Sequence, residues 1–143
     1  MRIARRVLQT LSVAAVICIC AVWSPAGAAG LDGSNTIICA FISATACENV
    51  SGCESTTPND LNLPQFFRVD FKNKRILMTD QTVEATNTGT GITSLQRLDG
   101  QLILQGVEIR AWNLVINEST GMMTLTASSG DEAFVLFGAC TVP

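Results

Sequence analysis

The sequence predicts an all-β protein, arranged as an antiparallel up-and-down meander of about eight short strands. Apolar residues after about position 30 recur mainly with a period of two, which is typical of half-buried strands. Turn-forming residues separate these runs, and no segment has the period of a long amphipathic helix. Closing such a meander into a small barrel would remove its exposed edges, so we favour a barrel, with a β-sandwich as the alternative.

The first 28 residues are predicted to be a secretory signal peptide. A positive start is followed by an apolar stretch over 7–23 and by small residues in signal-peptidase spacing, with Ala26 and Ala28 flanking Gly27. The apolar stretch contains polar residues and falls short of the roughly 20 apolar residues that a membrane span needs. We expect cleavage after Ala28, leaving 29–143 as a single domain in the periplasm or outside the cell, with no stable membrane insertion.

Removal of this leader makes the chain more acidic. The leader holds three of the nine basic residues and none of the twelve acidic ones, so the remainder has a formal net charge of −6. Phosphate binding needs clustered Arg and Lys, so we expect no nucleic-acid partner. Electrostatic steering would favour a cationic partner.

Four cysteines remain after cleavage, and an even number in an exported domain predicts two disulfides. Turn residues lie between Cys47 and Cys53, which favours that pair and leaves Cys39–Cys140 to join the first strand to the last. Such a long bridge would stabilise the fold by roughly 4 to 5 kcal/mol in a chain-entropy argument. The chain has no His and no C-x-x-C pair, so we assign no metal ligands.

The first half of the domain alternates strands with polar segments. We expect a first strand over 36–46, where a short helix is the alternative, and the longest loop over 48–63. The next strand places Phe67, Val69 and Phe71 on one face and turns at 72–74 into a strand over 75–78. The segment 86–91 has few apolar residues and is expected to be a flexible loop or a frayed edge.

The second half contains the clearest hairpin. Asp99-Gly100 is typical of a type I′ turn, which would place Leu95 opposite Leu104 and Arg97 opposite Leu102. A charge opposite Leu is expected at the core rim or in an ion pair. The next strand places Trp112 in the core, on one face with Leu114 and Ile116. Strands over 122–127 and 133–140 follow, and short turns make all these runs antiparallel neighbours.

Several segments resemble those of a family of small exported bacterial proteins without an assigned activity: LPQFFRVDF at 63–71, LILQGV at 102–107, WNLVINESTG at 112–121 and FGACT at 137–141. The resemblance implies a signal peptide, a β-rich domain and paired cysteines, but no activity. Similarity to periplasmic lysozyme inhibitors and calycin-type barrels is an analogy of size, export and strand pattern.

The composition argues against an enzyme. The absence of His and Tyr removes the commonest general base and several proton donors, and disulfide-bonded cysteines are not nucleophiles. Candidate acids for glycoside hydrolysis are Asp70, Asp80, Glu84 and Glu108, although solvated surface acids are the simpler interpretation. Turn chemistry likewise explains Asp131-Glu132 and 32–35 without calcium. We therefore assign no catalytic or cofactor-binding residues and expect no cofactor.

Two hypotheses for function remain. The first is a non-enzymatic binding module of the cell envelope, similar to a lysozyme inhibitor, whose acidic surface docks a cationic protein. The alternative is a carrier of a small apolar ligand inside a calycin-like barrel. Five residues are candidates for lining its cavity: Phe67, Phe71, Trp112, Met122 and Met123.

Overall fold

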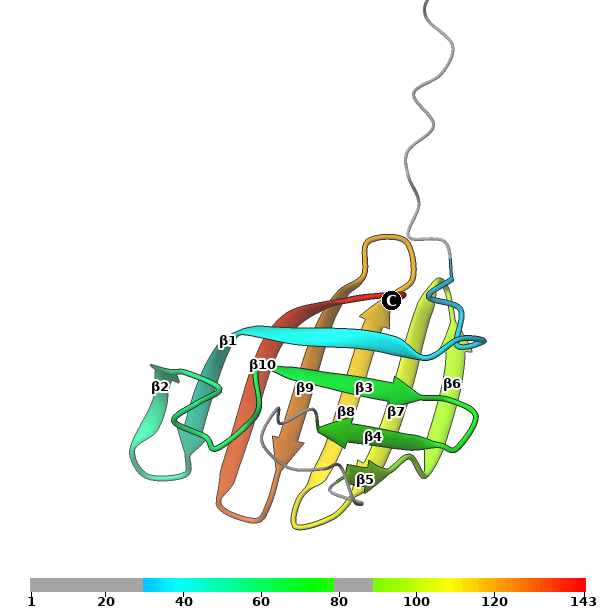
Figure 1. Cartoon of the computed structure of the whole chain (residues 1–143). Coiled ribbons are helices and arrows are strands. Elements are labelled where there is room, and N and C mark those ends of the chain that lie inside the picture. The colour runs from blue at the N-terminus through cyan, green and yellow to red at the C-terminus, as the bar shows by residue number, and fades with distance from the viewer. Residues whose placement is uncertain (1–29, 79–88) are drawn as a thin grey trace, which may run out of the picture.

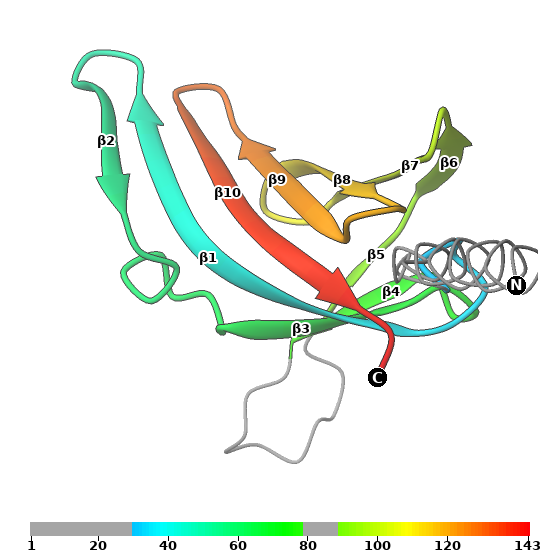
Figure 2. The ribbon, with the colours of Figure 1, turned by 90° about the horizontal axis from the view of Figure 1, so that it is seen from above.

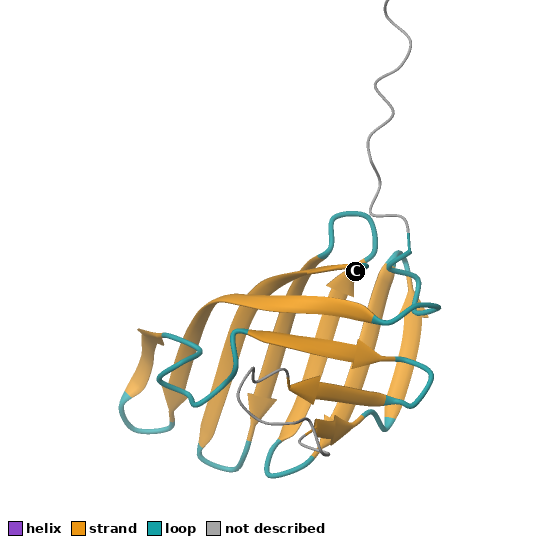
Figure 3. Cartoon of the chain, viewed as in Figure 1, coloured by secondary structure: helices purple, strands orange, loops and turns teal. Residues whose placement is uncertain are grey.

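The described residues form one antiparallel sheet. The computed structural model describes residues 30–78 and 89–143, and within them ten strands pair in the order β5-β4-β3-β1-β10-β9-β8-β7-β6, with β2 paired to β1. The strands are β1 (Ile37–Glu48), β2 (Gly52–Thr56), β3 (Phe66–Asp70), β4 (Arg75–Met78), β5 (Gly89–Gly91), β6 (Ser94–Leu98), β7 (Gln101–Val107), β8 (Ala111–Asn117), β9 (Met122–Ser128) and β10 (Glu132–Thr141). The all-β antiparallel class is confirmed, and Figure 3 shows only strands and loops in this part of the chain.

The sheet curls so that its two halves face each other. In Figure 1, β3, β4 and the first half of β1 run across β6 to β9, and Figure 2 shows β1 and β10 bending from one half to the other. The two ends of the sheet meet where β5 leads into β6. The Ile92 amide donates to the Lys74 carbonyl at 2.8 Å, whereas the adjacent Thr93 amide donates to the Gln105 carbonyl at 2.8 Å. Consecutive residues therefore join opposite ends of the sheet.

A bulge in β1 marks the bend between the two halves. The register of β1 against β10 shifts between Phe41 and Ser43, which leaves the intervening Ile42 67% exposed. Before the bulge β1 also pairs with β3, and after it with β2. A bulge bends its strand and increases the local twist, so β1 can belong to both halves. On β10, Gly138 lies opposite Phe41 and lets the backbones approach closely at this bend.

Two expectations for the first half of the domain were wrong. The predicted longest loop over 48–63 contains β2, and the first strand continues to Glu48 rather than ending at 46. Because β2 is an exposed edge strand of mostly polar residues, it lacks the alternation by which buried strands are recognised. Part of the predicted loop over 86–91 is β5, while residues 86–88 lie outside the described part. These two short strands raise the number from about eight to ten.

The predicted hairpin is confirmed in its register. Leu95 pairs with Leu104 and Arg97 with Leu102, while Asp99 and Gly100 have φ values of 50° and 73°. These positive values are what a type I′ turn requires. Arg97 forms an ion pair with Glu118 at 2.5 Å, and this contact raises the pKa of the Arg97 guanidinium. The charge opposite Leu102 is therefore paired, as expected.

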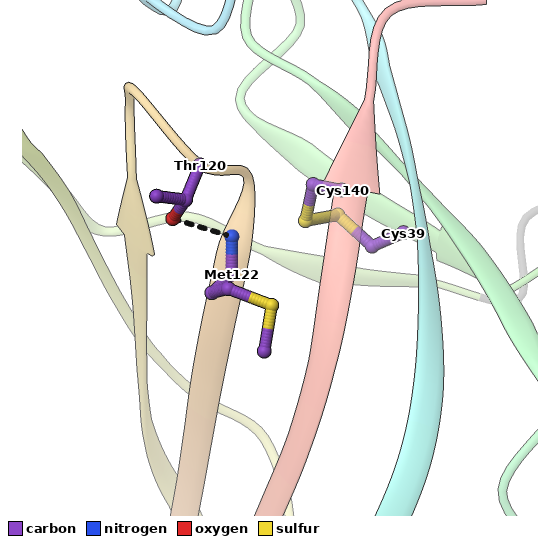
Figure 4. Close-up of a disulfide and its surroundings, with 4 residues drawn as sticks. All are labelled: Cys39, Thr120, Met122 and Cys140. Carbon is purple, nitrogen blue, oxygen red and sulfur yellow. Dashed lines mark hydrogen bonds between the residues drawn. A yellow bond between two sulfur atoms is a disulfide. The ribbon is translucent and has the colours of Figure 1, made fainter. Parts of the chain in front are cut away.

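Both predicted disulfides are present, and each joins directly opposed residues of neighbouring strands. Cys39–Cys140 links β1 to β10 in the interior, and Cys47–Cys53 links β1 to β2. Figure 4 shows the first bridge beside the start of β9, where the Thr120 hydroxyl accepts a hydrogen bond from the Met122 amide at 3.2 Å. Two disulfides indicate an oxidising compartment.

The predicted leader over 1–28 lies outside the described residues. Within residues 30–78 and 89–143, no helix is long and apolar enough to cross a membrane.

Substitution of Gly138 by Ala should destabilise the fold. The added Cβ would lie 2.1 Å from the Ala40 carbonyl oxygen and 2.3 Å from the Met123 methyl carbon, so the β1–β10 pair would have to separate. We expect a loss of about 2 kcal/mol or more in the free energy of unfolding, measured by urea denaturation. Gly130→Ala is the control, because nothing lies within 4 Å of its Cβ position. Equal stability of the two variants would contradict the prediction.

The two disulfides should contribute unequally to stability. Cys39–Cys140 spans 101 residues and Cys47–Cys53 spans 6. The chain-entropy argument gives the long bridge about 2.5 kcal/mol more stabilisation than the short one. We therefore expect the Cys39→Ser/Cys140→Ser double variant to unfold at clearly lower urea concentration than Cys47→Ser/Cys53→Ser. The reverse order would show that the contribution does not follow loop length.

Candidate functional site

The interior of the curled sheet is divided into a filled part and a hollow part. Around the Cys39–Cys140 bridge, large apolar side chains pack together, including Leu102, Leu104, Leu114 and Ile116, each no more than 1% exposed. Leu31, just before β1, is buried among them and closes this end of the core. Toward the turn between β7 and β8 the same strands instead surround a cavity of about 350 Å³.

The cavity wall is almost entirely apolar. Aromatic and aliphatic side chains come from the inner faces of β1, β3, β4, β8, β9 and β10: Phe41, Phe67, Ile76, Met78, Trp112, Leu125, Ala127, Phe134 and Leu136. Leu61 and Leu63 add to the wall from the segment between β2 and β3, which is closed by a hydrogen bond from the Leu63 amide to the Pro58 carbonyl at 2.9 Å. Such a surface favours an apolar occupant over a charged one.

The mouth of the cavity lies at the turn between β7 and β8. Glu108, Ile109 and Arg110 line it there, and Ile109 is 87% exposed, which places this turn at the opening. Arg110 forms an ion pair with Glu132 of β10, with its Nε atom 2.7 Å from Oε1. The guanidinium also lies 4.9 Å from the centre of the Phe134 ring. The ion pair and this cation–π contact hold the Arg110 side chain across the wall.

One hydrogen bond lies inside the apolar wall. The Trp112 indole Nε1 donates to the Thr90 hydroxyl at 3.1 Å, and both residues are buried. Gly106 on β7 faces Trp112 on β8 and provides the space for the indole, since a Cβ there would lie 2.2 Å from its Cζ2 atom. The same Cβ would lie 2.5 Å from the Gly91 carbonyl oxygen. Gly106 thus allows Trp112 and the chain at β5 to approach β7 together.

Two of the five predicted lining residues contact the cavity. Phe67 and Trp112 line it, whereas Phe71 and Met123 are buried in the filled core, and Met122 is 54% exposed. These last three assignments were therefore wrong. The sequence interpretation missed Phe41, Phe134 and Leu136, although alternation along 133–140 could have identified the latter two as inward-facing.

The candidate acids occupy separate structural roles. The Asp70 carboxylate accepts hydrogen bonds from the Asn73 amide at 2.9 Å and side-chain nitrogen at 2.7 Å, which lower its pKa. Glu108 lies at the cavity mouth, while Asp80 and Glu84 lie outside the described residues. Asp32 is bonded by Ser34, which lowers the Asp32 pKa. Within the described ranges, no group of three or more Cys, Asp or Glu side chains is placed to hold a metal ion.

No protein-family model, curated protein or solved structure shows significant similarity to this chain. The cavity is therefore interpreted from its own geometry and chemistry.

Substitution of Gly106 by Ala should disturb the cavity wall. The new methyl group would contact the Trp112 ring and the Gly91 backbone, so the indole should move and the protein should lose about 2 kcal/mol or more of stability. A red shift of tryptophan emission and a lower urea midpoint are the expected results. Gly91→Ala is the control, because its Cβ position has nothing within 4 Å. Unchanged emission in Gly106→Ala would contradict the packing described here.

Proposed function

We propose that this protein is an exported, non-enzymatic carrier of a small apolar molecule, which it binds in the cavity between the two halves of its sheet. The observation that supports this proposal is the cavity of about 350 Å³ with an almost continuous apolar wall. Ligand sites of proteins are commonly concave, mostly apolar and about 300 to 1,000 Å³ in volume.

The cavity is large for a packing irregularity. Protein interiors leave few voids larger than one water molecule. Because a water molecule occupies about 30 Å³ of the liquid, a space of 350 Å³ corresponds to roughly a dozen water molecules. The same strands pack without such a space around Leu104 and Leu114, so this fold and composition are compatible with a filled interior. The hollow is confined to the end that opens at the β7–β8 turn.

The small side chain of Ala127 contributes to the hollow. It lies on β9 opposite Trp112 of β8 and Phe134 of β10, and all three line the cavity. The cavity also favours a carrier over the other hypothesis, a module that docks a cationic protein such as a lysozyme. An apolar pocket offers binding energy to an apolar ligand through the area that leaves water, about 25 cal/mol per Å².

Trp112 provides a direct test of binding. The chain has two tryptophans, Trp23 and Trp112, and the first lies within the predicted leader. After cleavage, tryptophan fluorescence would report only on the cavity wall. Titration of the exported protein with the apolar dye N-phenylnaphthylamine should quench this emission saturably. An unsaturable response equal to that of free tryptophan would overturn the proposal.

Filling the cavity should remove binding. Ala127→Leu adds three carbons on the inner face of β9, so we expect the dye affinity to fall at least tenfold while the fold is retained. Thr126→Leu is the matched control, because the neighbouring Thr126 is exposed on the outer face and is not part of the cavity wall. Dye titration and urea denaturation of both variants provide the measurement. Equal affinity of the two variants would place the dye outside the cavity.

A further inference from the structure

Building on the proposed carrier function, we propose a chemical class for its ligand: a neutral, mainly hydrocarbon molecule of about a dozen non-hydrogen atoms, carrying one acceptor oxygen that binds the Thr90 hydroxyl inside the cavity. Ketones, aldehydes, esters and ethers belong to this class.

The Thr90 hydroxyl has a free donor. Its oxygen accepts the hydrogen bond from Trp112 Nε1, and a hydroxyl also carries one proton that it can donate. Among the described residues, no acceptor for this proton is found. Thr90 is only 7% exposed and lines the cavity, so bulk water is largely excluded from it. A buried donor without a partner costs free energy, which a ligand oxygen would recover.

The indole fixes the direction of this donor. Because Trp112 Nε1 occupies one acceptor position of the Thr90 oxygen, the hydroxyl proton must point away from the indole nitrogen. Gly106 holds the indole against β5 and thereby restrains the pair. A ligand would therefore meet a donor whose orientation is set before binding, which lowers the ordering cost of the hydrogen bond.

The remainder of the wall excludes other ligand classes. The other polar lining residues are Glu108 and Arg110, and both belong to the turn at the mouth. A carboxylate deep in the cavity would have one hydrogen bond to offset its desolvation, which is insufficient for a buried charge. A purely hydrocarbon ligand would leave the Thr90 proton without a partner. One neutral acceptor oxygen is the polar group that matches this wall.

A pair of ligands of equal shape tests the inference. Methyl nonyl ketone carries one acceptor oxygen, and the alkene in which a methylene group replaces that oxygen has nearly the same shape without an acceptor. Both are titrated against exported wild-type protein and Thr90→Val by displacement of N-phenylnaphthylamine. We expect the ratio of ketone to alkene affinity to fall roughly tenfold in Thr90→Val, the loss of about one hydrogen bond. The use of a ratio cancels the different transfer of the two ligands from water.

Two further variants separate the donor from the structural role of Thr90. Thr90→Ser keeps the hydroxyl and should retain the wild-type ratio. Thr90→Val leaves the Trp112 N–H without its acceptor, so Trp112→Phe and the Thr90→Val/Trp112→Phe double variant are compared as well. In the Phe background no indole donor is stranded, and the ratio should still fall when Thr90 becomes Val.

The outcomes distinguish the two proposals. A ratio that is the same with Thr90 and with Val in both backgrounds, while both ligands still displace the dye, would overturn the acceptor inference and leave the carrier function standing. Failure of the wild-type protein to bind the dye and both ligands would overturn both proposals. A selective loss for the ketone supports both.

Discussion

The long antiparallel pair of β1 and β10 is the constraint on which the rest of the structure depends. On one side β1 connects to β3, β4 and β5, and on the other β10 connects to β9, β8, β7 and β6. Apart from this seam, the sheet ends meet at the single crossing of residues 91–93. The Cys39–Cys140 bridge lies within the seam, so the covalent link acts where separation would open the interior. The bulge at Ile42 and the close approach at Gly138 then curve the sheet around that interior.

A small domain that keeps a cavity gives up part of its core packing, and this chain shows how the loss is offset. A domain of this size has a stability of about 5 to 15 kcal/mol, so an unfilled space of hundreds of cubic ångströms is a substantial sacrifice. The disulfides restrict the unfolded chain rather than adding contacts in the folded one, and they therefore stabilise the shell without filling it. Dense packing is kept around Leu31, Leu102 and Leu114, away from the mouth.

The wall of the cavity combines adaptable and fixed parts. Met78 and the leucines between β2 and β3 can adjust to a ligand, since methionine is flexible and that segment is partly exposed. Thr90, Trp112 and Gly106 form a fixed unit in which a glycine makes room for an indole and the indole orients a hydroxyl. At the mouth, Arg110 is restrained by Glu132 and Phe134. Selectivity would come from the fixed unit and affinity from the apolar area.

Local patterns by themselves determined much of this fold. The period of two specified the strands, Asp99-Gly100 specified a hairpin register, and the spacing of four cysteines specified both bridges. Strand β2 was not predictable in the same way, because an exposed edge strand needs no apolar alternation. The cavity depended on tertiary structure alone. Phe41, Phe134 and Leu136 alternate like ordinary core residues, and nothing local distinguishes them from Leu104 or Leu114. Whether inward-facing side chains meet or leave a space depends on the curvature that brings distant strands together, and only the folded chain sets that distance.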